Sequence, residues 1–427
     1  MSLADPTLLF FYSVINFFDK LVLGLAAVPI MKELQLTPAQ YGLVASSFYW
    51  LYAVSGTLVG LFLVNRIKSK YLLMILVAIW SIAQAPVAFS SSLTALVACR
   101  ILLGIGEGPG TPSAYDACHS WFPSDRRNFP TSIIIQGTSV GFLVGAPILT
   151  YVILTHGWRS AFLLCSVLGV IWIVAWAIFG RNGPISVHAP DNTAQGGSVP
   201  WSKLWLDRTM IGSYVLGFGS YWVVGLSIAW MAPYLQQGMG YDAKSIGWMI
   251  SAITAGGMPI SLGIAFTSER LLRAGVSSNI ARAAINAGAL VLGGVSFILA
   301  MSIDGGGYLK VALLALGFLL PSTSFTLGPA MVSEVAPTRQ RGTALLVTYS
   351  VITVAGFISP AVMGYALQSA GTDLVAGYAN AFRVTAAVLI VAGLAGFLLL
   401  KPDASRLRLA SVATDSGVDA ALAVRAA

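Results

Sequence analysis

Four charged side chains stand inside long apolar stretches of the sequence. Asp19 and Lys20 interrupt one stretch, and Arg100 and Glu107 interrupt another. Ionisable groups at bilayer depth are costly to bury, so they usually face a cavity and serve a function. Arg100 and Glu107 are seven residues apart, which is two helical turns, so they would share one helix face. These four residues are the first candidates for chemistry.

The two carboxylates are suited to reversible protonation, and the two cations to an anion. Burial disfavours the charged forms of Asp19 and Glu107, whereas nearby cations favour them, so a proton can be gained or lost as the surroundings change. Arg100 offers bidentate geometry to a carboxylate, and Lys20 offers a compact charge. We therefore expect proton coupling at the carboxylates and an anionic cargo at the cations. A second interpretation stays open, in which the four residues form a neutral network that only docks two helices.

The elements that carry these residues must be membrane helices. The chain has 427 residues, of which 57% are hydrophobic and 9% are charged, and soluble domains carry roughly 25% charged residues. Its apolar blocks are long enough to cross a hydrocarbon core of about 30 Å, and too long for barrel strands. In lipid, only helices or closed barrels satisfy the hydrogen-bonding groups of the backbone. Twelve blocks are predicted, near residues 8–31, 41–64, 71–90, 94–118, 130–154, 160–180, 210–236, 245–268, 283–301, 307–333, 342–369 and 380–400.

The charges would lie near the middle of the bilayer. Asp19 is roughly 16 Å along a helix that enters near residue 8, and Glu107 is roughly 20 Å along one that enters near residue 94. Both depths fit a site at the midplane.

Lysine and arginine fall mainly on alternate connections between the blocks, which predicts that this side is cytoplasmic. Both termini would then be cytoplasmic, and we expect a multi-pass protein of the cell inner (plasma) membrane. The net charge of +8 is better explained by anchoring to membrane lipid than by nucleic acid, because no clustered basic domain is present. The basic connections hold Arg66, Lys68, Lys70, Arg126, Arg127, Arg181, Lys203, Arg208, Arg270, Arg273, Arg282, Arg339 and Arg341.

Internal similarity predicts two pseudo-symmetric six-helix halves. Pro123 and Arg127 recur as Pro337 and Arg341, as expected of parallel repeats with a substrate held between them. The predicted fold class is an all-α membrane protein of twelve transmembrane helices, the major facilitator fold. We expect an N-terminal half at 1–180, a cytoplasmic linker at 181–207, a C-terminal half at 208–400 and a disordered cytoplasmic tail at 401–427.

Aromatic residues supply further candidates for the path of the cargo. Tyr49, Tyr115, Trp222 and Trp230 could stack on an aromatic or heterocyclic ring, although lipid-facing and interfacial packing is the default for most such residues. The cysteines and histidines show no metal-ligand spacing, and no nucleophile and base pair or phosphate loop is apparent. We therefore expect no metal, no cofactor and no enzymatic activity.

Several motifs resemble a known family. The run Arg100-Ile-Leu-Leu-Gly-Ile-Gly-Glu107-Gly-Pro109, continuing to Trp121-Phe122-Pro123 and Arg126, resembles the fourth-helix signature of the anion:cation symporter family, within the major facilitator superfamily. Asn16-Phe-Phe-Asp19-Lys20 is similar to that family's first-helix motif, and Gly157-Trp-Arg-Ser-Ala-Phe162 to its entry to the sixth helix.

The resemblance implies roles for individual residues. The family includes proton-driven importers of sugar acids and other organic carboxylates. In such relatives the residues matching Asp19 and Glu107 are implicated in proton coupling, and the one matching Arg100 in pairing with a carboxylate. The usual arginine of the first helix is Lys20 here, which keeps the charge but loses the planar fork.

The superfamily's loop between the second and third helices is altered. Its acidic and final glycine positions are Asn65 and Lys68, whereas Arg66 is retained. We expect Arg66 and Arg126 to take part in gating on the cytoplasmic side.

The expected function is proton-coupled symport of a small organic anion into the cell by alternating access, performed by a monomer. One alternative is a proton-antiport exporter of an aromatic metabolite or drug. A more remote alternative is a sensor that binds a solute without moving it. The direction of transport under a proton gradient separates the first two.

Overall fold

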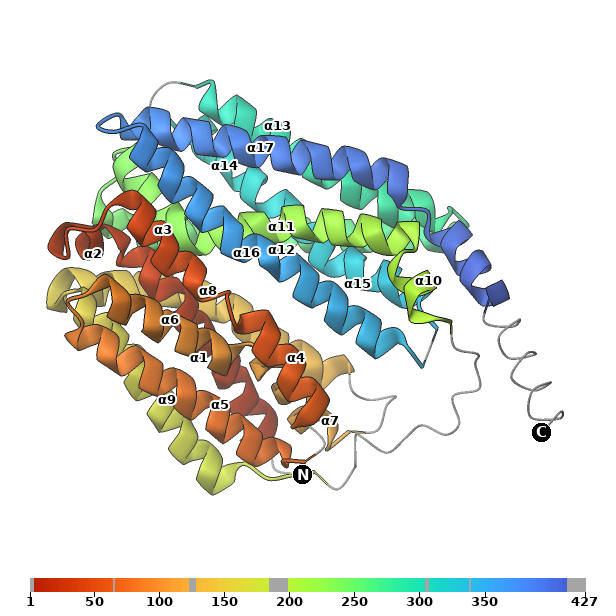
Figure 1. Ribbon diagram of the computed structural model, residues 1–427, viewed down its shortest axis with the longest axis horizontal. Helices are drawn as coiled ribbons and strands as arrows, with labels where there is room; N and C mark the ends of the chain where they lie inside the picture. Colours follow the sequence, from red (N-terminus) through yellow and green to blue (C-terminus); the bar gives the residue numbers. More distant parts are fainter. Residues whose placement is uncertain are drawn as a thin grey trace. The chain divides into compact units, whose positions relative to one another are not determined.

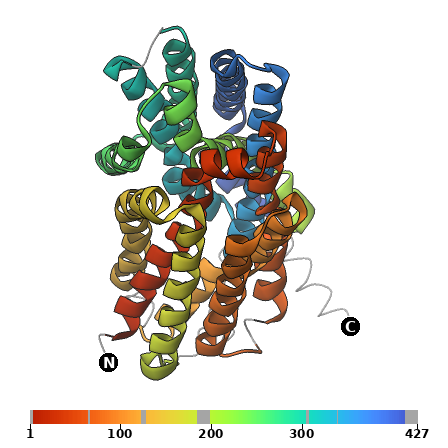
Figure 2. The same ribbon diagram turned by 90° about the vertical axis from the view of Figure 1, so that its left-hand side faces the viewer.

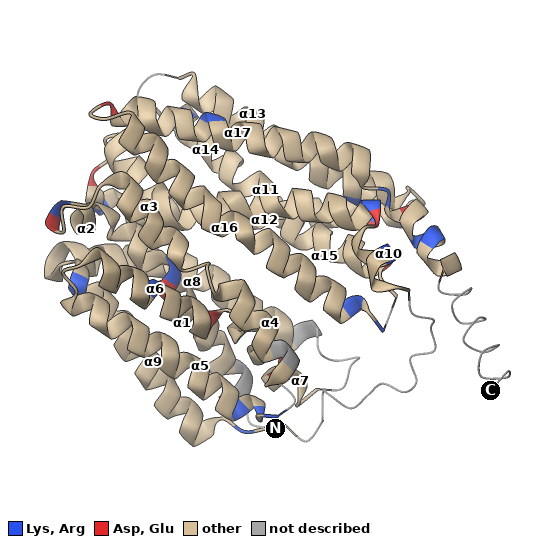
Figure 3. Cartoon of the chain, viewed as in Figure 1, with Lys and Arg blue, Asp and Glu red and all other residues tan. Residues whose placement is uncertain are grey.

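The computed structural model describes residues 4–63, 66–122, 128–183, 199–303, 307–337 and 339–412. These residues form helices and no β-strand. Within them, 12 helical segments are long and apolar enough to cross a membrane. Figure 3 shows that most of each helix carries no charged side chain. The predicted all-α fold class and its twelve spans are confirmed.

From α1 to α9, and again from α10 to α17, the helices follow one another in chain order (Figure 1). The first six spans use α1 (Ala4–Leu25), α3 (Pro38–Ser47) with α4 (Tyr52–Phe62), α5 (Ser69–Gln84), α6 (Leu93–Glu107) with α7 (Gly110–His119), α8 (Asn128–His156) and α9 (Trp158–Phe179), and a short α2 (Ala27–Glu33) follows α1. The others use α11 (Arg208–Pro233), α12 (Ala243–Arg273), α13 (Ile285–Met301), α14 (Tyr308–Leu319) with α15 (Ser324–Val335), α16 (Arg341–Ser369) and α17 (Leu374–Leu399), after a short α10 (Trp201–Trp205).

Local sequence explains where several helices begin. Thr37 and Gln40 form a capping box at the start of α3, with Pro38 in the first turn, and Ser92 accepts the backbone N–H of Ala95 to cap α6. Such caps satisfy N–H groups that have no partner inside the helix. The turn before α9 places Gly157 at φ 82°, a conformation that glycine adopts without strain.

The chain divides into two compact units. The first comprises Met1–Ala189, Gly225–Ala255 and Gly356–Ala381, and the second comprises Pro190–Val224, Gly256–Ala355 and Phe382–Ala427. The first unit therefore holds the first six spans together with parts of α11, α12, α16 and α17. The predicted halves at 1–180 and 208–400 differ from this division and stay a prediction.

In the first unit, α1 packs along α8 and α9, and α5 packs along α6 and α9, as both views show (Figures 1 and 2). Glycines allow the closest approach. An added Cβ would lie 2.4 Å from the Phe10 carbonyl oxygen at Gly137, and 2.8 Å from the Phe17 side chain at Gly141. Glycines four residues apart lie on one helix face, so α8 presents a smooth surface to α1.

The first unit also joins α3 to segments from late in the chain. The Tyr41 hydroxyl donates to the Ala229 carbonyl oxygen at 3.0 Å, and an added Cβ at Gly42 would lie 2.6 Å from the Pro360 carbonyl oxygen. The end of α1 approaches α11 equally closely, because an added Cβ at Gly24 would lie 2.0 Å from a backbone oxygen of α11. The backbones of α1 and α3 therefore lie close to those of α11 and α16.

The expected tail and linker contain ordered structure. Residues 402–412 are helical, so the prediction of a disordered tail is wrong for this part. Its apolar positions are spaced to bury Leu409, which packs with Leu204 of α10 and with Val332. Residues 184–198 of the linker and 413–427 of the tail lie outside the described residues.

Candidate functional site

The sequence around Glu107 breaks the fourth span in two. Residue 107 ends α6, and α7 begins at Gly110 after Gly108 and Pro109. Proline has no N–H to continue a helical ladder, and glycine weakens the helix beside it. The apolar pattern predicts one continuous helix here, whereas the structure places a carboxylate at a helix break. The interruption is local, because the Gly108 N–H still donates to the Gly104 carbonyl oxygen at 3.0 Å and the Pro109 carbonyl oxygen accepts the Ser113 N–H at 3.1 Å.

The glycines of α6 set how closely the broken helix approaches α3 and α4. At Gly104 an added Cβ would lie 2.0 Å from the Phe48 carbonyl oxygen, and at Gly108 it would lie 2.0 Å from that of Tyr52. Both distances are too short for any side chain. The glycine spacing therefore brings the end of α6, and Glu107 with it, into the interior of the first unit.

Lys20 and Glu107 form a buried ion pair between α1 and α6. The Lys20 Nζ lies 2.6 Å from Glu107 Oε2, and the two side chains are 10% and 0% exposed. Lys20 also donates a hydrogen bond to Asn16 Oδ1 one turn earlier and lies 4.8 Å from the ring centre of Phe17. The charge of Lys20 is thus compensated inside the protein.

Asp19 points to a different helix. It is fully buried, and its Oδ1 accepts a hydrogen bond of 2.8 Å from Gln84 Nε2. Its Oδ2 has no hydrogen-bond partner among the described residues. Successive residues of a helix are rotated by about 100°, so Asp19 faces α5 while Lys20 faces α6. Gln84 is the last residue of α5, before the 3₁₀ turn Ala85–Phe89.

Arg100 is buried without an acidic partner. It is 3% exposed, and its guanidinium carbon lies 5.1 Å from the ring centre of Phe48. Within the described part of the chain no carboxylate lies at ion-pair distance from it, and its Nε and Nη1 have no hydrogen-bond acceptor. A buried arginine normally pairs with carboxylates or phosphates. Arg100 is therefore the cation best placed to accept an added anion.

The four predicted charged residues therefore lie in the first unit, and two of them, Lys20 and Glu107, form an ion pair. Figure 3 shows charged positions within the interior of α1 and α6, which are otherwise tan. The pairing of Lys20 with Glu107 also fits the interpretation in which charges dock two helices. The docking interpretation and the transport interpretation differ in whether the Lys20–Glu107 ion pair must open during function.

The predicted aromatic residues are dispersed. Tyr49 is 7% exposed and packs 4.9 Å from Phe48, next to Arg100. Tyr115 stacks on a histidine at the end of α7. In the second unit, the indole N–H of Trp222 donates to a threonine of α17 at 3.2 Å. In the first unit, the Trp230 side chain is 1% exposed, and its indole N–H donates to a backbone oxygen of α16 at 3.0 Å. Only Tyr49 is brought close to the charged residues, and cargo binding by any of the four stays a prediction.

The predicted gating residues are not part of this cluster. Arg66 is exposed in the connection between α4 and α5, and Arg126 lies outside the described residues. Their role stays a prediction.

Sequence reasoning missed two amides that contact the charged residues. Asn16 and Gln84 contact Lys20 and Asp19 and are 4% and 1% exposed. Both are lone amide side chains inside apolar blocks, which is the signal that could have found them, because a buried amide needs hydrogen-bond partners.

Comparison with known proteins supports the resemblance. The sequence profile of the Major Facilitator Superfamily matches residues 9–360. A probable sulfoacetate transporter of Cupriavidus necator is 27% identical over 400 residues, which are 90% of each chain. A hexuronate transporter of Bacillus subtilis is 25% identical over 93% of this chain and 94% of its own. A D-galactonate transporter of Escherichia coli is 27% identical over 93% and 95% of the two chains.

Solved structures show the same fold. A bacterial homologue of the human lysosomal transporter Spinster superposes with a TM-score of 0.79, at 16% identity, over 95% of this chain and 98% of that one. A D-xylose-proton symporter gives 0.75 at 14% identity, over 94% and 98%. With the profile match, these findings establish that the chain is a multi-pass membrane protein and belongs to the major facilitator superfamily of transporters.

Proposed function

We propose that this protein imports a small organic anion, a carboxylate, together with protons across the cell inner membrane, with both termini in the cytoplasm. The observation that carries the proposal is the buried Lys20–Glu107 ion pair in the same unit as Arg100, which has no ion-pair partner among the described residues. The named substrates of three relatives, sulfoacetate, hexuronate and D-galactonate, are all small organic anions. The proposed cargo has the same chemistry.

The ion pair offers a simple way to couple a proton to an anion. When Glu107 is protonated it loses its charge, and Lys20 is left as a buried cation whose remaining hydrogen-bond acceptor among the described residues is Asn16. An uncompensated buried cation is strongly unfavourable, so an anion that replaces the lost carboxylate charge is bound. Arg100 supplies the second positive charge. Proton binding and anion binding thus favour one another.

Release reverses these steps. Once Glu107 loses its proton, its carboxylate competes with the cargo for Lys20 and re-forms the 2.6 Å pair. Asp19, held by Gln84 at 2.8 Å, provides a second protonation site near the first. If two protons accompany one monovalent anion, one net positive charge enters, and the membrane potential contributes about 2.3 kcal/mol per 100 mV.

The test uses the purified protein in liposomes with radiolabelled sulfoacetate, D-galactonate or a hexuronate. An inwardly directed proton gradient should drive accumulation by the wild type. Glu107→Gln should abolish this accumulation while retaining exchange of labelled for unlabelled cargo, because the neutral amide mimics the protonated acid. Glu269→Gln is the matched control, since Glu269 is exposed on α12 and forms an exposed ion pair with Arg273.

Three results would oppose the proposal. Unchanged accumulation by Glu107→Gln would remove this residue from coupling. Loss of exchange as well as accumulation in Glu107→Gln would favour the docking network. Accumulation only against the direction of proton flow would identify an exporter.

A further inference from the structure

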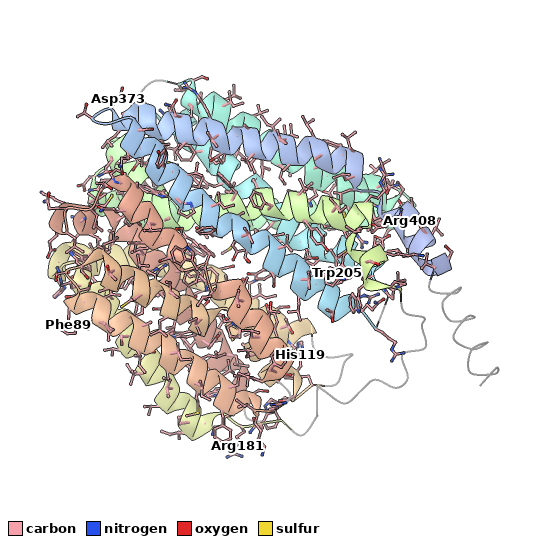
Figure 4. The ribbon with its side chains drawn as sticks, viewed as in Figure 1. Phe89, His119, Arg181, Trp205, Asp373 and Arg408 are labelled. Carbon is pink, nitrogen blue, oxygen red and sulfur yellow. The ribbon has the colours of Figure 1, made fainter. Side chains whose placement is uncertain are left out.

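Two short helices meet at one end of the second unit. Leu204 of α10 and Leu409 of the 402–412 helix are both buried in one core cluster with Met210 near the start of α11. Figure 4 labels Trp205 and Arg408 at this end. The span of α11 begins at Arg208, and that of α17 ends at Leu399. The two short helices therefore lie where membrane spans end.

Polar contacts fix the 402–412 helix to the start of α11. Asp207 is fully buried, and its Oδ1 accepts the Thr209 N–H at 2.7 Å. Its Oδ2 pairs with Arg408. The hydroxyls of Thr209 and Ser405 are hydrogen-bonded at 2.7 Å. The buried acid is neutralised, and the 402–412 helix is held against the start of α11.

A cavity of about 440 Å³ opens between these helices. It is lined by Ser202, Lys203, Leu206, Arg408, Leu409 and Val412. Lys203 is exposed and has no ion-pair partner among the described residues. The Arg408 side chain is 55% exposed, and a guanidinium has five N–H donors, so its pairing with Asp207 leaves donors for a second anion. We call this the basic cavity.

Apolar side chains surround the basic cavity on the surface. Leu206 is 73% exposed, Leu407 is 69% exposed and Trp201 is 41% exposed, and the rings of Trp201 and Trp205 lie 5.3 Å apart. Exposed apolar and aromatic residues interleaved with lysine and arginine are typical of the membrane interface. Contact with water is therefore unfavourable for the apolar part of this surface. A lipid can contact both parts, its acyl chain the apolar residues and its headgroup the basic ones.

We propose that the basic cavity binds an anionic glycerophospholipid. The phosphate contacts Lys203 and Arg408, and an acyl chain lies along Leu206 and Val412. Charge complementarity selects a net negative lipid, because Arg408 is balanced by Asp207 whereas Lys203 leaves one positive charge at the cavity. A zwitterionic headgroup would bring a cation of its own against these side chains.

Native mass spectrometry of the full-length protein, with phosphatidylglycerol or phosphatidylcholine added, tests this site. The wild type should retain phosphatidylglycerol in preference. Lys203→Gln should lower its apparent affinity about fivefold, the effect of one basic residue at an anionic lipid surface, and Lys203→Arg should preserve it. Arg270→Gln is the control, since it removes one exposed charge of α12 outside the cavity. Equal melting temperatures would show that the variants are folded.

Equal retention of both lipids, or an unchanged affinity in Lys203→Gln, would overturn the proposal. Displacement of the lipid by glycerol 1-phosphate at equal concentration would also oppose it, because the site would then recognise phosphate without the acyl chain. A shortened chain that ends at Val412 tests whether the protein's own C-terminal segment competes with lipid for the cavity. If phosphatidylglycerol bound only to this shortened chain, the occupant of the cavity would be the protein's own C-terminal segment.

Discussion

Breaking the Lys20–Glu107 pair from one side should destabilise the protein far more than removing both partners. At 2.6 Å and an effective dielectric constant near 20, the two charges attract by about 6 kcal/mol. Desolvation offsets part of this. Loss of one partner leaves the other charge buried and typically costs about 3–5 kcal/mol. The expected destabilisation is therefore of this size for Glu107→Gln and for Lys20→Met.

A double-mutant cycle measures the interaction. The free energy of unfolding of the wild type, the two single variants and the double variant is determined by SDS-induced unfolding in mixed micelles. The double variant should be more stable than the sum of the single effects predicts, by about 2–3 kcal/mol. The exposed pair Arg273–Glu269 is the control, with a coupling below about 1 kcal/mol. Additivity within about 0.5 kcal/mol at Lys20 and Glu107 would refute the buried pair.

Three further outcomes follow from single sites. Gly108→Ala should lower the melting temperature strongly, because its Cβ would lie 2.0 Å from a carbonyl oxygen of α4, whereas Gly256→Ala, with nothing within 4 Å, should not. Hydrogen bonds from the Trp158 indole and the Arg159 guanidinium lower the pKa of Glu33 from 4.5. Glu33→Gln should therefore destabilise the protein at pH 7, and its difference from the wild type should shrink as the pH falls below about 4.5, because the stabilisation from a lowered carboxyl pKa is complete above the unfolded-state pKa and is lost as the pH falls through the folded-state pKa. Arg100→Gln should raise the KM for an anionic cargo at least about tenfold, because a charged hydrogen bond contributes about 1.5–3 kcal/mol, and Arg100→Lys should restore only part of the affinity; binding assays on the purified variants check both.

The spans could be predicted from the sequence because apolar length is a local property. A block either is or is not long enough to cross the bilayer, and the depth of Asp19 or Glu107 follows from its position in the block. The choice of partners is not local. It depends on the rotation between Asp19 and Lys20 and on the helix break after Glu107, neither of which an apolar pattern encodes.

Two other features depended on tertiary contacts. The contact of the Gln84 amide with Asp19 could not be predicted, because it depends on how α5 packs against α1. The 402–412 helix is short and carries several charges, and it is ordered because Leu409 and Ser405 find partners on α11 and its neighbours. Composition alone favours disorder for such a segment.

The most direct measurement is the movement of protons when cargo is added without any imposed gradient. Liposomes containing the protein are suspended in weakly buffered medium, and sulfoacetate or D-galactonate is added outside while the external pH is recorded. Symport predicts that the medium becomes more alkaline as protons enter with the anion, and that Glu107→Gln gives no signal. Acidification of the medium, or uptake of the anion with no pH change in the wild type, would contradict proton-coupled import.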